Sequence, residues 1–123
     1  MIKGILIAES LRPGTDLAVP GLRLARLTRT DVSGSVVATQ PTLWTLLHFE
    51  AADELADELA QALAGSLRPE DGWYADFTVG EDHVVVFTGK VFRYRRGDEA
   101  GRAEAVAYGR AAGTPEHQLD WGA

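Results

Sequence analysis

The sequence predicts an α+β fold: a mostly antiparallel sheet with two helices packed on one face, ferredoxin-like or related, with extra N-terminal strands. Several segments have the alternating or continuous apolar residues of strands, whereas only residues 52–64 and 99–112 have a helical pattern. Helices are absent between most of the strands, which disfavours a doubly wound parallel sheet. An irregular α+β sandwich is the alternative. The length of 123 residues suits a single domain spanning 1–123.

The first three strands are predicted from their residue types and alternation. Ile2–Leu11 carries β-branched isoleucines. Leu22–Val32 alternates and then slips in phase at Ala25, as a strand with a bulge does. A loop rich in proline and glycine joins these two strands, which we expect to pair directly. Leu43–Phe49 is apolar on both sides, which is typical of an interior strand.

The two helices are bounded by clear signals. In Ala52–Ala64, leucines recur every four residues with acidic residues on the opposite side, and Gly65 ends the helix. The second helix, Glu99–Ala112, follows Asp98, a good N-cap residue. Its apolar side consists mostly of alanine, which allows close packing.

The remaining strands lie between and after the helices. Trp73–Val79 alternates, and His83–Phe87 is almost continuously apolar. Thr88–Gly89 supplies a two-residue hairpin turn, after which Lys90–Arg95 returns as the partner strand. A short last strand is expected at Gln118–Trp121.

The composition narrows the class of protein. Cysteine is absent, so a disulfide scaffold, a thiol nucleophile and a cysteine-ligated metal are excluded. The net charge of −6 disfavours binding to nucleic acid. No apolar stretch reaches transmembrane length, and the N-terminal apolar run is too short for a secretory signal. We therefore expect a cytoplasmic protein that does not associate with membranes.

Motifs for known chemistry are lacking. The chain has no glycine-rich phosphate loop, no nucleophile elbow and no zinc-protease helix pattern. None of the three histidines, His48, His83 and His117, lies three or four residues from another, so no helix presents a metal-binding pair. We predict neither a metal nor a cofactor.

Alternation within the strands predicts one face with aromatic and titratable residues. If the helices cover the side of the sheet that carries Trp73, Phe77, Leu47 and Phe49, a different set shares the other side. That set is Trp44, Leu46, His48, Tyr74, Asp76 and Thr78.

We favour a binding or interaction module that self-associates through this face. An exposed surface with Trp44, Leu46 and Tyr74 is more apolar than a monomer usually tolerates. Pairing of two identical sheets buries it, and two-fold dimers are the commonest homo-oligomers. The sequence therefore predicts a homodimer with these three residues at the interface.

Two other classes stay open. One is a small cofactor-independent enzyme, an isomerase or similar, in which Asp76 or His48 is the base and Tyr74 the proton donor. The other is a sensor of an anionic metabolite, with Arg93 and Arg95 as the ligand-binding cations. A concave pocket at Asp76 or His48 favours the enzyme, and a flat dry patch favours the interaction module.

Four segments resemble a family of small uncharacterised bacterial proteins. They are KGILIAESL near the N-terminus, WYADF at 73–77, VVVFTGKVF at 84–92, and YGRAAGTPEHQLDW from Tyr108. The family has no assigned activity, cofactor or catalytic residue, so the resemblance implies only a bacterial, intracellular, single-domain protein and transfers no functional position.

Overall fold

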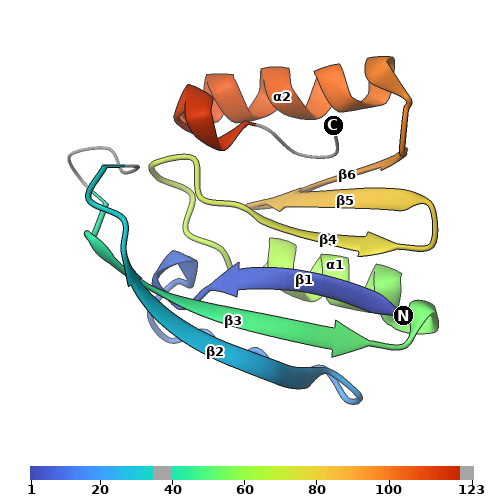
Figure 1. Ribbon diagram of the computed structural model, residues 1–123, viewed down its shortest axis with the longest axis horizontal. Coiled ribbons are helices and arrows are strands. Elements are labelled where there is room, and N and C mark those ends of the chain that lie inside the picture. The colour runs from blue at the N-terminus through green and yellow to red at the C-terminus, as the bar shows by residue number, and fades with distance from the viewer. Residues whose placement is uncertain (35–39, 120–123) are drawn as a thin grey trace.

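The computed structural model describes residues 1–34 and 40–119, which form one six-stranded sheet with two helices (Figure 1). The strand order is β2-β3-β1-β4-β5-β6, and every neighbouring pair is antiparallel. The predicted α+β class with an antiparallel sheet is confirmed. The strands are β1 (Ile2–Ile7), β2 (Arg23–Asp31), β3 (Leu43–Ala51), β4 (Ala75–Val79), β5 (Asp82–Phe87) and β6 (Lys90–Arg95). The helices are α1 (Ala56–Ala64) and α2 (Glu99–Ala112).

The N-terminal strands join the same sheet as the rest, but the expected direct pairing of β1 with β2 is wrong. β3 lies between them and pairs with both. The reason is the composition of β3, whose two apolar sides stabilise an interior position, whereas β2 is largely exposed and occupies the edge. The predicted bulge is confirmed, because the β2–β3 register shifts between Leu24 and Arg26.

One face of the sheet packs against α1. Leu59 and Leu63 of the helix are almost fully buried in a cluster with Ile2, Phe49 and Phe77 from three neighbouring strands. The acidic side of the helix faces solvent. A 3₁₀ turn at Asp53–Leu55 precedes α1, so the regular helix starts later than the sequence pattern predicts.

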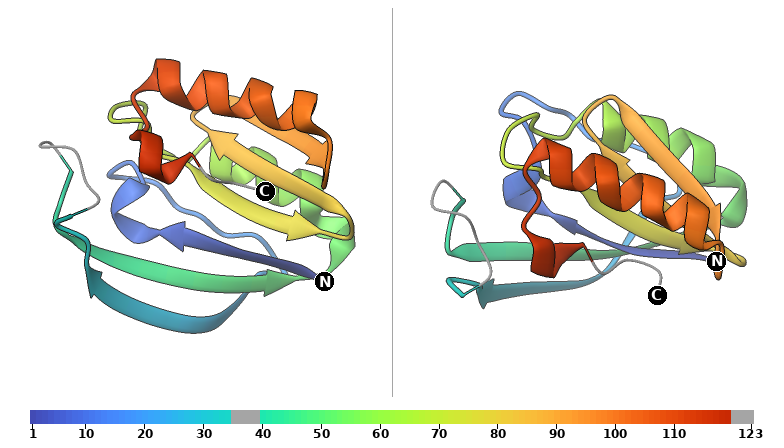
Figure 2. Two further views of the ribbon diagram at one scale, coloured as in Figure 1. Left: turned by 45° about the horizontal axis from the view of Figure 1, so that its top comes forward. Right: turned by 90° about the horizontal axis from the view of Figure 1, so that it is seen from above.

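The helix α2 covers the opposite face, so the prediction that both helices pack on one face is wrong (Figure 2). Val84 belongs to the α1 cluster, whereas Val85 packs with Ala105 of α2. Successive residues of a strand point to opposite faces, and β5 is apolar on both, so each side requires a cover. The likeness to a ferredoxin-like sheet stays a prediction.

Two local features allow α2 to lie close to the sheet. Asp98 caps the helix, and its carboxylate accepts a hydrogen bond of 3.1 Å from the backbone N–H of Gly101. A Cβ atom added at Gly101 would lie 2.6 Å from the Cβ of Tyr94 on β6, so only glycine permits this approach. The predicted N-cap is confirmed.

Trp73 departs from its predicted position beside Phe77. It lies with Trp44 and Ile7 on the face opposite α1, with the two indole rings 5.4 Å apart. The chain turns sharply just before, where Asp71 and Gly72 have φ angles of 64° and 65°. Regular alternation therefore begins only at Ala75, the first residue of β4.

The C-terminal segment, as far as it is described, lies on the face opposite α1 and contains no strand up to Leu119. Glu116–Gln118 is a 3₁₀ turn, and the carbonyl of Gln118 accepts a 3.2 Å hydrogen bond from the Tyr74 hydroxyl. Asp120 and Trp121, which belong to the predicted strand, lie outside the described residues.

Candidate functional site

Among the described residues, α2 covers the face opposite α1 only over β5 and β6. The part formed by β1, β3 and β4, which we call the open face, presents side chains in rows across the three strands. In the middle row, Ile5 is paired with His48 on β3 and with Asp76 on β4. His48 and Asp76 therefore flank Ile5 on the same face, as the sequence predicts.

The rows change in character along β1. Lys3 is paired with Glu50 on β3 and with Thr78 on β4, so this row is polar. Two residues further along the same face, the Ile5 row combines one apolar and two titratable side chains. The last row is apolar, with Ile7 paired with Leu46. The open face thus has a polar end and an apolar end.

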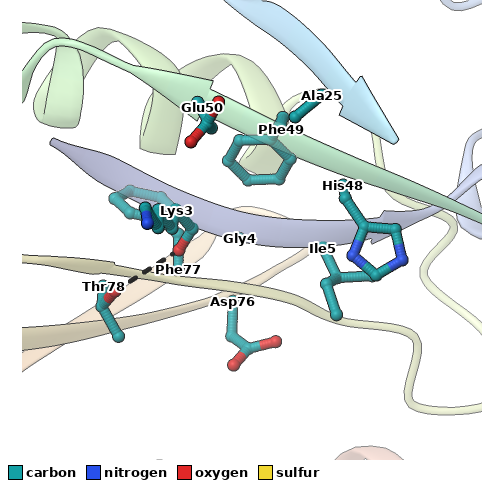
Figure 3. A pocket seen from close by; sticks show the side chains of 10 residues that line it. All are labelled: Lys3, Gly4, Ile5, Ala25, His48, Phe49, Glu50, Asp76, Phe77 and Thr78. Atoms are coloured by element: carbon teal, nitrogen blue, oxygen red, sulfur yellow. Dashed lines mark hydrogen bonds between the residues drawn. The ribbon is translucent and has the colours of Figure 1, made fainter. Parts of the chain in front are cut away.

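Two hollows lie over these rows. The first, of about 380 Å³, covers the Lys3 and Ile5 rows, and the second, of about 320 Å³, covers the Ile5 and Ile7 rows. Figure 3 shows the first hollow, with Ile5 between His48 and Asp76. Ile5 and Asp76 line both hollows, so the two hollows are adjacent and meet at these side chains. Concave apolar surfaces with a few convergent polar groups are the usual form of a ligand site.

Asp76 is held by a histidine that the sequence analysis treated only as a metal ligand. The Nε2 atom of His83 lies 3.0 Å from Oδ2 of Asp76. The two residues are diagonal neighbours, since Thr78 is the direct partner of His83 across β4 and β5. The Asp76 side chain is 33% exposed and that of His83 only 12%, so the carboxylate faces the hollows and the imidazole lies behind it.

The His83 ring is fixed from below by Tyr94. The two rings stack nearly parallel, with centroids 5.7 Å apart and an interplanar angle of 11°. The Tyr94 hydroxyl is buried and, within the described part of the chain, has no hydrogen-bond partner. Burial raises the pKa of Tyr94 above its ordinary 10.0; the Arg102 charge opposes this shift and that of Asp76 adds to it. The phenol is therefore neutral at physiological pH.

The three predicted interface residues differ in exposure. Trp44 is only 8% exposed, since it packs against Trp73 and its indole N–H donates to the Pro41 carbonyl over 3.0 Å. Leu46 and Tyr74 are half-buried and line the second hollow. The apolar residue that projects from the open face is Ile5, at 40% exposure, which the sequence analysis did not select.

The two candidate anion-binding arginines lie elsewhere. Arg93 is paired with Val84 and therefore lies on the α1 side of the sheet. Its guanidinium contacts the chain's own carboxylates, with Nε 2.8 Å from Asp82 and Nη1 3.7 Å from Asp57. Arg95 is paired with Asp82 on the same side. The structure thus does not bring Arg93 and Arg95 to the open face.

Residues that the sequence analysis missed complete the site. Lys3, Ile5 and His83 line or support the hollows. The alternation of β1 places Lys3 and Ile5 on one side, and the tight turn between β4 and β5 fixes the diagonal position of His83. Within residues 1–34 and 40–119, no group of three or more histidine, aspartate or glutamate side chains is arranged to hold a metal ion.

Comparison of the chain with protein-family models, with curated proteins and with solved structures finds no match in any of the three. The resemblance of four segments to small bacterial proteins therefore stays a prediction. Neither helix of the described chain has both the length and the apolar character needed to cross a membrane.

Proposed function

We propose that the protein binds a small amphipathic molecule on the open face. The polar end of the molecule lies near Lys3, His48 and Asp76, and its apolar part lies over Ile7 and Leu46. The observation that carries this proposal is the pair of adjacent hollows that share Ile5 and Asp76. Each hollow, at about 380 and 320 Å³, falls at the lower end of the volumes that ligand pockets have.

The polar groups of the hollows retain capacity to bind a ligand. Only one carboxylate oxygen of Asp76 is engaged by His83, and the other accepts no hydrogen bond from the described residues. Lys3 forms no ion pair within the same part of the chain, because its neighbour Glu50 is bound by Arg23 over 2.7 Å. A ligand that meets these groups forms hydrogen bonds without breaking any that exist.

The apolar part of the hollows supplies the affinity. Ile5 is 40% exposed, so covering it removes apolar surface from water at about 25 cal/mol per Å². Trp44 lines the apolar end, and Trp73 packs against it. Small-molecule sites in general have the same composition: apolar walls provide most of the binding energy, and a few polar groups fix the orientation of the ligand.

The test uses an anilinonaphthalene sulfonate dye, which has apolar rings and one anionic group. We expect dye fluorescence to rise on binding to the wild type and the affinity to fall at least 10-fold in Ile5→Glu. Leu27→Glu is the matched control, because Leu27 is 54% exposed on β2 and lines neither hollow. Equal affinities of the wild type and Ile5→Glu would refute binding at the open face.

Self-association through the same face is a second candidate, favoured by the exposure of Ile5 at its centre. A two-fold pairing of open faces would bury this residue against the partner copy. Light scattering at high protein concentration distinguishes self-association from binding of a small molecule to a monomer. A dimer that Ile5→Glu dissociates and Leu27→Glu preserves supports self-association, whereas a monomer that binds the dye supports the small-molecule site.

A further inference from the structure

We propose that the open face catalyses a proton transfer on its ligand, a 2-oxo acid with an apolar side chain. In this proposal Asp76 removes a proton from the carbon next to the carbonyl group, and His48 protonates the carbonyl oxygen. The inference rests on the proposed binding of a small amphipathic molecule and adds the substrate class and the reaction.

The placement of His48 and Asp76 suits such a reaction. They are the two cross-strand neighbours of Ile5, one on each side. Adjacent strands lie about 4.8 Å apart, so the Cα atoms of His48 and Asp76 are roughly 10 Å apart. A flat molecule that lies on Ile5 therefore has a carboxylate on one edge and an imidazole on the other, and both side chains line the same hollow (Figure 3).

His83 is a positioning residue for Asp76. Its hydrogen bond of 3.0 Å holds one carboxylate oxygen, and its stacking on Tyr94 holds the imidazole. The second oxygen of Asp76 is left to accept a proton from the ligand. The charged and titratable groups around this pair and its hollows come from five elements: Tyr94 from β6, Arg102 from α2, Lys3 from β1, His48 and Glu50 from β3, and His117 from the C-terminal 3₁₀ turn.

The open face offers a group for each part of a 2-oxo acid. The carbonyl group and the adjacent CH₂ lie over Ile5, between His48 and Asp76. The carboxylate is bonded directly to the carbonyl carbon, so it meets the Lys3 ammonium when the long Lys3 side chain extends along the strand across the roughly 7 Å that separates its row from the Ile5 row. The apolar side chain extends the other way, into the second hollow beside Leu46.

The step balances without a cofactor. The C–H bond breaks, its proton goes to the Asp76 carboxylate, and its electron pair forms a C=C bond. The π electrons of the carbonyl group move to the oxygen, which takes a proton from the imidazolium of His48. The product is the enol, and exchange with water returns one proton to His48 and removes one from Asp76. General acid–base catalysis of this kind contributes roughly 100- to 10,000-fold in rate.

The experiment measures deuterium incorporation into phenylpyruvate at its CH₂ group in D₂O by NMR. We expect wild-type protein to accelerate exchange at least 10-fold over buffer. Asp76→Asn, with its fold verified by circular dichroism, is expected to remove the acceleration. The matched control is Asp57→Asn, the same change at a residue of α1 whose side chain is 97% exposed on the other face.

The role of His83 has its own readout. In His83→Gln, circular dichroism verifies the fold, and we expect the exchange rate at saturating phenylpyruvate to fall with little change in the concentration that gives half of that rate, because Asp76 loses the hydrogen bond that orients its carboxylate. A saturating rate identical to that of the wild type would remove His83 from the mechanism.

Two results would overturn the proposal. If phenylpyruvate exchanges no faster with the protein than in buffer while the dye still binds in an Ile5-dependent manner, proton transfer is wrong and binding stands. If Asp76→Asn exchanges at the wild-type rate, the base is not Asp76. If the dye instead binds the wild type and Ile5→Glu equally, the proposed binding at the open face is wrong, and the proton-transfer proposal that rests on it is wrong as well.

Discussion

Trp73 lies against Trp44 with ring centroids 5.4 Å apart and an interplanar angle of 54°, and Trp44 forms part of the floor of the second hollow, at the apolar end of the open face. The contact joins the segment before β4 to β3, across the intervening β1. Trp73 is only 4% exposed, so nearly all of its apolar surface is buried. The floor of the candidate site is therefore also part of what stabilises the fold.

The first prediction concerns this floor. Trp73→Ala leaves a cavity beside Trp44 and is expected to lower the free energy of unfolding by about 3–5 kcal/mol. Chemical denaturation monitored by circular dichroism measures the change. Leu27→Ala, at a 54% exposed position, is expected to change stability by less than about 0.5 kcal/mol. A loss at Trp73 no greater than that at Leu27 would contradict the described packing.

The second prediction compares two tyrosines. The Tyr94 hydroxyl is buried without a hydrogen-bond partner among the described residues, whereas the Tyr74 hydroxyl donates to the Gln118 carbonyl. Removing an unsatisfied buried group relieves a desolvation cost, so Tyr94→Phe is expected to raise the free energy of unfolding by about 1 kcal/mol. Tyr74→Phe loses a hydrogen bond and is expected to lower it by about 1 kcal/mol. Thermal unfolding measures both changes in stability. A destabilising Tyr94→Phe together with a stabilising Tyr74→Phe would contradict the hydrogen bonding described for the two hydroxyls.

The third prediction is the pH dependence of stability. Burial raises the pKa of Tyr94 above 10.0, so the folded protein holds this proton more tightly than the unfolded chain. Titration of this group therefore leaves the free energy of unfolding unchanged well below 10.0 and lowers it as the pH rises through the higher folded value. Urea titrations on both sides of this pH should show a steeper alkaline loss in the wild type than in Tyr94→Phe. Tyr108→Phe, which removes an exposed phenol, is expected to retain the steep loss.

Local signals in the sequence predict most elements of this fold. The phase slip at Ala25 locates the bulge of β2, and Asp98 marks the start of α2. Both features are determined by residues that are close in the sequence, so the local sequence pattern is enough to predict them. The strand β5 is apolar on both faces, so its sequence pattern does not show which face each helix covers. That choice depends on contacts between distant parts of the chain.

The candidate site was predictable in part for the same reason. Alternation alone assigns His48 and Asp76 to one face, because successive residues of a strand point to opposite sides. The Asp76–His83 pair requires in addition the register across the turn between β4 and β5, where Val79 is paired with Asp82. The position of Trp73 required the backbone turn at Gly72, which the strand pattern does not show.

The last prediction tests the close approach of β1 to its neighbours. Gly4 lies between Lys3 and Ile5, at a position where a side chain would point toward the α1 side. A Cβ atom added there would lie 2.5 Å from Cζ of Phe49 and 2.6 Å from the backbone oxygen of Asp76. The phenyl ring has little room to move in the core, and the backbone oxygen belongs to β4, so the strands must separate.

We expect Gly4→Ala to lower the free energy of unfolding by about 1–3 kcal/mol, the usual cost of overpacking. Gly34→Ala is the control, because an added Cβ atom there meets nothing within 4 Å and the glycine has no positive φ angle. This control is expected to leave stability unchanged or to raise it by up to about 1 kcal/mol. Because Gly4→Ala displaces β4 and therefore Asp76, it should also weaken dye binding at the open face. Full stability of Gly4→Ala would show that β1 and β4 do not approach as closely as described.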